Sequence, residues 1–548
     1  MVDLQSEIAC PPNEPALEYR PGSTERERLQ EALAGLDGRE MEIPLIIGGR
    51  EVRTGRIGKV RCPHDHGRVL AVYHQAGPEE IIQAERAAEK AWKDWARAPA
   101  SSRLAVFRKA AQLLAGKRRL DVVAATMLNQ SKTVHQAEIE AACELIDFFR
   151  FNAYFASILG RLHPNSDSTE LNYFDLRPLE GFVLAVSPFN FTAIAGNLPS
   201  APAMVGNTCL WKPASSVVFS NYQVMLVLQE AGLPDGVINF LPGPGSEVGK
   251  AALGQPSLAG VHFTGSTTTF RWIWTEVARN LETYRNYPRL VGETGGKDFV
   301  VVHASAEPAS TVTALIRGAF EYQGQKCSAV SRAYVPNNLW PEIRGRLVDE
   351  IRTIRTGDPS DFSNFMGAVI DRPAFDRITQ YLELASDSDD CTILTGGRTD
   401  DSAGYFVDPT VIVTADPRHR LMSEEIFGPV LTVYVYPEEE FPEILGLCDR
   451  TSPYALTGAV FATDRKAVDL ALSRLRFAAG NFYINDKPTG AVVGRQPFGG
   501  ARASGTNDKA GSVFNLSRWI SPRSVKENLQ PPEDYRYQFM SPGELVEG

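Results

Sequence analysis

From residue 181 onward, short apolar runs alternate with helical stretches, and this alternation limits the fold more than any other feature of the chain. The apolar runs end in turn residues: GFVLAVSP (181–188), NTCLWKP (207–213), VINFLPG (237–243) and GVHFTG (260–265). A helical stretch, SNYQVMLVLQEAGLPDG (220–236), separates the second run from the third. Strand–helix–strand alternation of this kind builds a parallel, doubly wound sheet. The predicted fold class is therefore α/β.

A second α/β region is predicted from about residue 299, where FVVVH begins. Residues 308–322 place apolar side chains on one face of a predicted helix, at the i, i+3, i+4, i+7 spacing. That helix ends at a loop that carries Cys327. Later strands are predicted at TVIVTA (410–415), PVLTVYVYP (429–437), GAVFATD (458–464) and GNFYIND (480–486).

The N-terminal part of the chain is predicted to be mainly helical. Residues 1–40 are predicted to form a polar arm that ends in a short helix, and EIPLIIGGREVRTG a hairpin that turns on Gly48-Gly49. Residues 78–158 have helical periodicity, and Ser101 or Ser102 is expected to cap the second of these helices.

Length and charge exclude some classes of protein. A chain of 548 residues is too long for one core, so two or three domains are expected. The net charge is −10 and no Lys/Arg cluster offers a basic face, which disfavours a nucleic-acid partner. The most apolar region, residues 181–206, is interrupted by proline and polar residues, so no membrane helix is expected.

Cysteine and histidine usage points to a reducing compartment and no metal site. The seven cysteines are widely spaced, without a C-x-x-C pair, so neither a disulfide framework nor a zinc site is predicted. His64 and His66 are predicted to lie in a surface loop, because nothing nearby completes a metal site. The N-terminus has neither a secretory nor a mitochondrial pattern, so a cytoplasmic location is expected.

Three distant residues carry the candidate chemistry. Cys327 lies in a loop with Lys326, and a positive neighbour is expected to favour the thiolate, although most lone cysteines are buried and inert. Glu293, before Gly295-Gly296, is a candidate base, and Asn190, at a strand end, is a candidate oxyanion donor. Two glycine-rich turns, 241–249 and 263–272, favour a nucleotide site. Spacing alone does not bring these segments together.

Seven motifs, in order along the chain, resemble those of the aldehyde dehydrogenase superfamily. They are SPFNFT, LWKPAS, FTGS, GETGGKD, GQKCSA, EEIFGPV and PFGGARASG. The resemblance implies a Rossmann-variant cofactor domain, an α/β catalytic domain and a small β oligomerisation element. These are assigned to 1–160 with 181–292, to 293–485, and to 161–180 with the tail 486–548. A homo-oligomer, at least a dimer, is implied, with a hairpin near 161–180 and the tail at its interface.

The stretch YINDKPTGAVVGRQPFGGARASGTNDKAG (483–511) is similar to the subfamily that oxidises L-glutamate γ-semialdehyde to L-glutamate. On that resemblance, Cys327 is the nucleophile, Asn190 stabilises the oxyanion and Glu293 activates the hydrolytic water. The resemblance assigns NAD to Ser187, Lys212, Gly265, Ser266, Glu425 and Phe427. It assigns the substrate to Ser328, Gly490, Ala491 and Phe498.

One alternative concerns the cofactor, and three concern the activity. Ser215 stands where many NAD-selective relatives carry glutamate, which leaves NADP open as a secondary cofactor. Another semialdehyde, such as succinate semialdehyde, would need the same catalytic residues, and the loop 488–496 distinguishes the two substrates. A catalytically silent, NAD-binding structural protein is disfavoured because the cysteine, glutamate and asparagine are all present. A fusion to proline dehydrogenase is not expected.

Overall fold

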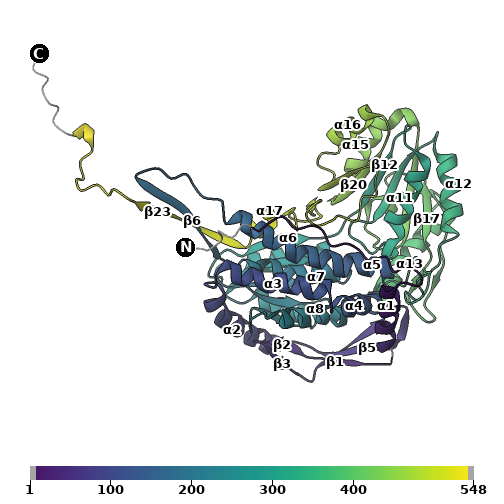
Figure 1. The fold of residues 1–548 in the computed structure, drawn as a ribbon. Helices are drawn as coiled ribbons and strands as arrows, with labels where there is room; N and C mark the ends of the chain where they lie inside the picture. The colour runs from purple at the N-terminus through teal and green to yellow at the C-terminus, as the bar shows by residue number, and fades with distance from the viewer. Residues whose placement is uncertain (1–7, 37, 541–548) are drawn as a thin grey trace, which may run out of the picture.

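The computed structural model describes residues 8–36 and 38–540. Two lobes, each built around a seven-stranded sheet, lie next to each other, and a two-stranded sheet extends from the first lobe (Figure 1). Most neighbouring strands of the two large sheets are parallel, and helices connect them. The α/β class predicted from the sequence is confirmed.

The first large sheet has the strand order β11-β10-β7-β8-β9-β2-β3. Its parallel strands are β7 (Phe182–Val186), β8 (Thr208–Lys212), β9 (Ile238–Phe240), β10 (Leu258–Thr264) and β11 (Arg289–Glu293). The connections are α7 (Thr192–Met204), η2 (Ser215–Val217), α8 (Val218–Ala231), α9 (Gly245–Leu253) and α10 (Thr267–Arg279). Because the strands are parallel, their carboxyl ends meet at one edge, which is where ligands bind such sheets.

The hairpin predicted at Gly48-Gly49 is confirmed, and it extends this sheet. β2 (Leu45–Ile47) pairs antiparallel with β3 (Arg50–Val52), and the two glycines have φ of 57° and 75°. A tight turn of type I′ requires positive φ at both central residues, and glycine adopts it without steric cost. A separate sheet of order β1-β5-β4 contains β1 (Met41–Ile43), β4 (Ile57–Cys62) and β5 (Asp65–His74).

The helices predicted between residues 78 and 158 are confirmed. They are α2 (Pro78–Trp95), α3 (Ala100–Ala115), α4 (Arg119–Gln130), α5 (Val134–Ala137) and α6 (Glu144–Leu159), with a π-helix η1 (Glu138–Cys143) before α6. The predicted cap is wrong: α3 begins at Ala100, directly after Pro99, so Ser101 and Ser102 lie within its first turn. The described part of the N-terminal arm leads into α1 (Thr24–Gly35), as predicted.

The second large sheet has the order β14-β17-β18-β13-β12-β20-β21. Its strands are β12 (Asp298–Val302), β13 (Val330–Pro336), β14 (Cys391–Thr395), β17 (Thr410–Thr414), β18 (Val430–Tyr436), β20 (Thr457–Phe461) and β21 (Asn481–Ile484). Its helices are α11 (Pro308–Phe320), η3 (Glu321–Gly324), α12 (Trp340–Ile351), α13 (Arg372–Ser386), α14 (Arg420–Ser423), η4 (Glu438–Glu440), α15 (Phe441–Thr451) and α16 (Arg465–Arg474). Four short strands complete the lobe: β15 (Thr399–Asp400), β16 (Phe406–Val407), β19 (Tyr454–Ala455) and β22 (Ala501–Arg502).

The two-stranded sheet joins the middle of the chain to its end. β6 (Glu170–Pro178) pairs antiparallel with β23 (Ile520–Asn528), from Pro178 opposite Ile520 to Glu170 opposite Asn528. The hairpin expected within 161–180 is therefore wrong, because this segment supplies only one strand. Before β6 the chain makes a turn, in which the Asp167 carboxylate accepts hydrogen bonds from the Thr169 and Glu170 backbones. α17 (Val513–Ser517) precedes β23, and η5 (Gln538–Met540) follows it.

In the described residues, no helix is both long enough and apolar enough to cross a membrane.

Candidate active site

The loop that carries Cys327 is held by the side chains of two glutamines. After α11, Tyr322 and Gln323 adopt positive φ, so the chain turns sharply. Gln323 donates to the backbone oxygens of Ser131 and Ala368, at 3.0 and 2.7 Å. Gln325 accepts from the Ile370 backbone at 2.9 Å. These hydrogen bonds fix the backbone immediately before the cysteine.

Cys327 is partly exposed, and its surroundings favour the neutral thiol. Burial raises the pKa of this thiol well above its usual value, and the carboxylates of Asp298, Glu293 and Glu425 raise it further. The expectation that Lys326 favours the thiolate is wrong. Its ammonium group lies among carboxylates of its own, 2.7 Å from Glu140 Oε1 and 3.2 Å from Glu321 Oε2. The positive charge of Lys326 is therefore balanced by Glu140 and Glu321. A base is then needed to ionise Cys327.

Glu293, the last residue of β11 and the base predicted from the sequence, is one of three carboxylates whose charge acts on the Cys327 thiol. Its carboxylate accepts a hydrogen bond of 3.3 Å from the Gly500 backbone, and burial raises its pKa well above the usual value. Lys509 lies near enough to lower that pKa in part. A Cβ at Gly499 would lie 2.9 Å from Glu293 Oε1, so a side chain there would force the carboxylate to shift. The segments GETGGKD and PFGGARASGTNDKAG therefore meet at this side chain.

Gly295 and Gly296 allow the close approach that the sequence predicted. A Cβ at Gly296 would overlap the backbone oxygen of Cys327, and one at Gly295 would overlap the Glu425 carboxylate. The Gly296 backbone N–H donates to Glu425 Oε1 at 2.9 Å. The GGKD segment thus lies between the cysteine loop and the EEIFGP segment.

Asn190 lies against the cysteine loop from the opposite lobe. Its side chain is buried, and Nδ2 donates a hydrogen bond of 3.1 Å to the Gln325 backbone oxygen. An amide nitrogen carries two hydrogens. One bond to Gln325 therefore orients the group and leaves its second amide hydrogen available as a donor.

The predicted cofactor residues are located at the carboxyl edge of the first sheet. Ser187 and Lys212 end adjacent strands, and the Ser187 hydroxyl accepts from Trp211 Nε1 at 3.0 Å. Lys212 is buried, which lowers its pKa to about 8, and within residues 8–36 and 38–540 no carboxylate pairs with it. A buried ammonium group without a counter-charge is costly, so this position fits a polar ligand such as a ribose.

The remaining predicted cofactor residues lie at the N-terminus of α10 and in the second lobe. Gly265 precedes α10, and the Ser266 side chain caps it by accepting from the Thr269 backbone at 3.2 Å. A helix N-terminus of this kind fits the pyrophosphate group of a dinucleotide. Across the lobes, the rings of Phe427 and Phe189 are in edge contact at 5.7 Å, which brings EEIFGP beside SPFNFT.

The predicted substrate residues are linked to the nucleophile by one hydrogen bond. The hydroxyls of Ser328 and Thr489 lie 2.7 Å apart, and both side chains are buried. Thr489 lies near the start of the loop 488–496, the anchor loop. In this loop Gly490 has φ of 89° and is followed by Ala491. Phe498 exchanges two backbone hydrogen bonds with Ala510. The anchor loop is thus fixed to the residue that follows Cys327.

The comparisons with known proteins agree with this geometry. The sequence model of the aldehyde dehydrogenase family matches residues 52–525. The chain belongs to the aldehyde dehydrogenase family. It is 52% identical over 539 residues to the mitochondrial Δ1-pyrroline-5-carboxylate dehydrogenase of Dictyostelium discoideum, which covers 98% of this chain and 97% of that protein.

Two further relatives carry the same name. The aldehyde dehydrogenase chain is 50% identical over 529 residues to the mitochondrial Δ1-pyrroline-5-carboxylate dehydrogenase of Homo sapiens, over 96% of this chain and 94% of that protein. The crystal structure of the Mycobacterium tuberculosis enzyme bound with NAD superposes with a TM-score of 0.95. It is 52% identical and covers 98% of this chain and 100% of that one.

Sequence reasoning missed a buried charge network beside the nucleophile of this aldehyde dehydrogenase. Glu140, on the π-helix η1, bridges Lys132 at 2.6 Å and Lys326 at 2.7 Å. The Lys132 ammonium also lies over the rings of Phe191 and Tyr322, at 4.5 and 4.3 Å. π-Helical turns frequently occur at functional sites. No spacing rule in the sequence links Lys132 to Lys326, so this network had no detectable signal.

Glu144, at the start of α6, was also missed. Burial raises its pKa to about 8, the nearby Glu140 raises it too, and Lys132 and Lys326 oppose them. In the part of the chain that the structure describes, no hydrogen bond or ion pair occupies its carboxyl group, and the residue is partly exposed. Its motif, ELIDFFRFNA, also carries Asp147, Arg150 and Asn152, so nothing in the sequence singled out Glu144.

The surface position predicted for His64 is wrong, whereas His66 is partly exposed. His64 is buried, with Nδ1 3.0 Å from Ser131 Oγ and Nε2 3.0 Å from Cys62 Sγ. Burial lowers its pKa to about 4. The reason is that the turn after β4 packs on the end of α4, a contact between segments far apart in the sequence.

Proposed function

We propose that this chain oxidises L-glutamate γ-semialdehyde, in equilibrium with Δ1-pyrroline-5-carboxylate, to L-glutamate, with NAD as electron acceptor. This is the second step of proline breakdown. The observation that carries the proposal is the 2.7 Å contact between Ser328 and Thr489, which joins the nucleophile to an anchor loop suited to a carboxylate. The names of the relatives at about half identity support the same substrate.

The reaction begins with the thiol of Cys327. Because burial and nearby carboxylates raise the pKa of this thiol, a base would accept its proton, and Glu293 is the residue proposed for that role. The sulfur then attacks the aldehyde carbon, a C–S bond forms, and the carbonyl oxygen becomes an anion. The Asn190 amide and the Cys327 backbone N–H would donate to that oxygen. One such donor lowers the barrier by ~3 kcal/mol.

The cofactor residues fit NAD by their chemistry. NAD, when bound, takes the hydride that the tetrahedral carbon loses. Lys212 and Ser187 would bind the adenosine ribose, and the N-terminus of α10 at Gly265 and Ser266 the pyrophosphate. Glu425 and Phe427 would hold the nicotinamide ribose and ring. Loss of the hydride leaves a thioester on Cys327.

Hydrolysis of the thioester completes the reaction. Glu293 first releases the proton of the thiol to solvent and then takes a proton from water, while the water oxygen attacks the acyl carbon. The C–S bond breaks, the sulfur takes the proton back from Glu293, and the carboxylic acid loses the second proton to solvent. The products are L-glutamate, the reduced cofactor and the restored Cys327. The sum is aldehyde, NAD⁺ and water to carboxylate, NADH and two protons.

The amino-acid end of the substrate carries an α-carboxylate and an α-ammonium group, and the site needs a partner for each. The backbone N–H groups of Gly490 and Ala491, with the Ser328 hydroxyl, would bind the α-carboxylate, and Phe498 would contact the aliphatic chain. Glu144 would bind the α-ammonium group, whose positive charge would oppose the raised pKa of this carboxyl group and favour its ionised form. A Glu144→Gln variant is expected to raise KM for this substrate and leave KM for NAD unchanged.

The test of the function is reduced-cofactor absorbance with pyrroline-5-carboxylate and NAD, compared with succinate semialdehyde at the same concentrations. A higher kcat/KM for pyrroline-5-carboxylate is expected. A preference for succinate semialdehyde would keep the mechanism and overturn the substrate. Inactivity with every aldehyde would instead favour the silent, NAD-binding structural protein.

NADP is proposed as a secondary cofactor. Ser215 donates a hydrogen bond of 3.3 Å to the Gly243 backbone oxygen, so a neutral hydroxyl lies beside the turn that leads into α9. A carboxylate at this position would repel a 2′-phosphate, whereas serine does not. Measurable turnover with NADP at a higher KM is expected. A Ser215→Glu variant should lose NADP activity and keep NAD activity, and equal losses with both would contradict the proposal.

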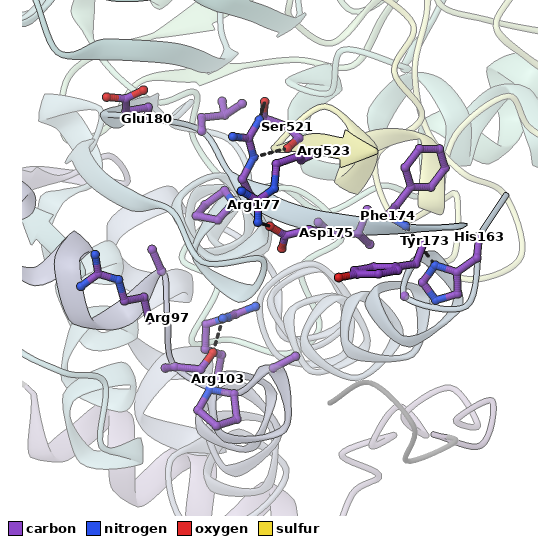
Figure 2. Close-up of a pocket in the computed structure, with 18 of the residues that line it drawn as sticks. Arg97, Arg103, His163, Tyr173, Phe174, Asp175, Arg177, Glu180, Ser521 and Arg523 are labelled. Atoms are coloured by element: carbon purple, nitrogen blue, oxygen red, sulfur yellow. Dashed lines mark hydrogen bonds and ion pairs between the residues drawn. The ribbon is translucent and has the colours of Figure 1, made fainter. Parts of the chain in front are cut away.

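A homo-oligomer, at least a dimer, is proposed for the assembly. A groove lined by β6, β23 and the start of α3 includes Arg97, Arg103, Arg177 and Arg523, and no candidate catalytic residue lines it (Figure 2). Leu171, Tyr535, Tyr537 and Phe539 are exposed along this projecting region. Truncation after Ser521 is expected to yield a monomer by light scattering. A truncated dimer would overturn the proposed interface.

A reducing compartment, here the cytoplasm, is proposed for the location. All seven cysteines are free, which suits reducing conditions. The Dictyostelium and human relatives are named as mitochondrial proteins, so the mitochondrial matrix is the competing compartment. Cell fractionation with markers for both compartments distinguishes them.

A further inference from the structure

The N-terminal arm contacts the anchor loop through Asn13. The two hydrogens of the Asn13 amide are both used: Nδ2 donates to the Val493 backbone oxygen at 2.7 Å and to Asp147 Oδ2 at 2.7 Å. The Asn13 oxygen accepts from Arg495 Nε at 2.9 Å. One side chain therefore binds the loop twice and the helix α6 once.

The arm itself is fixed by charged groups. The Glu14 backbone N–H donates to Asp147 Oδ1 at 2.8 Å. The Glu14 carboxylate bridges Arg119 at 2.6 Å and Arg150 at 2.7 Å. Because Arg119, Asp147 and Arg150 come from two helices of the first lobe, the arm is a rigid support rather than a loose tail at this point.

Helix α6 also packs against the anchor loop. Gly494 has φ of 82°, and a Cβ there would overlap the Phe151 ring. Val493 is buried in the core of the first lobe. The second half of the anchor loop is thus held between α6 and the arm, while its first half is held by Ser328 through Thr489.

We propose that Asn13 is a positioning residue that sets substrate specificity by holding the anchor loop in its carboxylate-binding conformation. The inference rests on the proposed function. Backbone N–H groups bind a carboxylate well only when they are held in place before binding. Simple aldehydes have no carboxylate for the loop to bind, so their oxidation is independent of Asn13.

The test compares two substrates with one variant. Asn13→Ala is expected to raise KM for pyrroline-5-carboxylate about tenfold, the effect of losing one or two hydrogen bonds, with kcat within about twofold. Its kcat/KM for propanal and its KM for NAD should equal those of the wild type. The matched control is Tyr19→Phe, which removes another contact of the arm, the 2.8 Å bond to Glu138, without touching the loop. This control should leave both substrates unaffected.

A second variant removes the partner of Asn13 on the anchor loop. Arg495→Ala should raise KM for pyrroline-5-carboxylate in the same way, and the double variant should be less than additive, as expected for residues in direct contact. An unchanged KM in Asn13→Ala would overturn the inference, as would equal losses with propanal. Wild-type inactivity with pyrroline-5-carboxylate but not propanal would instead overturn the proposed function.

Discussion

The side-chain amide of Asn190 donates a hydrogen bond of 3.1 Å to the backbone oxygen of Gln325, two residues before Cys327. This bond crosses from the first lobe to the second and leaves the other amide hydrogen for the proposed oxyanion. Asn190→Ala should therefore lower kcat by ~10²–10³-fold, the effect of losing an oxyanion donor. The matched control is Asn197→Ala, on the following helix, which loses only a bond to Asn152. Equal kcat in the two variants would contradict this role.

The raised pKa of Cys327 predicts slow alkylation in the absence of ligands. Without a thiolate, iodoacetamide should react with the exposed Cys10 before it reacts with Cys327 at neutral pH. Peptide mass spectrometry over time gives the two rates. Faster labelling of Cys327 would mean that its thiol is already ionised and that Glu293 is not needed for the first step.

The raised pKa of Glu293 predicts the acid limb of the pH profile. The base must be deprotonated to accept a proton, so activity falls as pH drops through its pKa. Because burial raises that pKa, kcat/KM should decline at a pH above the ordinary glutamate value of ~4.3. Glu293→Gln should remove this limb and most of the turnover. A limb retained in that variant would assign the titration to another group.

The buried network of Glu140 predicts a large loss of stability on neutralisation. Glu140→Gln would leave Lys132 and Lys326 without their shared counter-charge, which costs roughly 3–5 kcal/mol of unfolding free energy. The exposed pair Glu342–Arg346 is the control, and Glu342→Gln should change the free energy by less than about 1 kcal/mol. Urea titration of both variants checks this difference.

Two buried histidines predict a loss of stability in mild acid. Burial lowers the pKa of His64 and of His262 to about 4. In the unfolded chain these histidines bind protons near pH 6.5. The stability that the neutral, buried histidines contribute is therefore fully present above that pH, and it is lost as pH falls from about 6.5 to 4. Each histidine accounts for up to roughly 3 kcal/mol of this loss. His262→Gln should flatten the slope of stability against pH in this window, and an unchanged slope would contradict the assignment.

Local patterns in the sequence were sufficient to predict the structure of segments whose conformation depends on their own residues. The Gly48-Gly49 turn needs positive φ at both residues, and the apolar spacing of 308–320 needs a helix. The closeness of Gly295-Gly296 to other groups follows from their missing Cβ atoms. In each case the signal and the structure occupy the same few residues.

Predictions failed where the partner is distant in sequence. Lys326 was expected to act on Cys327, its neighbour in the chain, but its charge is used by Glu140 on η1. His64 was expected at the surface, but Ser131 and α4 cover it. The strand that pairs with β6 comes from the end of the chain rather than from 161–169. Tertiary contacts of this kind leave no periodicity to detect.

The pairing of β6 with β23 has a consequence for biosynthesis. On the ribosome, β6 is translated early, whereas β23, its strand partner in the described residues, emerges after the entire second lobe. During that interval the nascent chain carries an open strand edge, and such edges are sites of aberrant pairing. Premature termination before β23 would leave both edges of β6 unpaired, whereas in the finished sheet β23 covers one of them, so synthesis of the last strand removes one site of aberrant pairing.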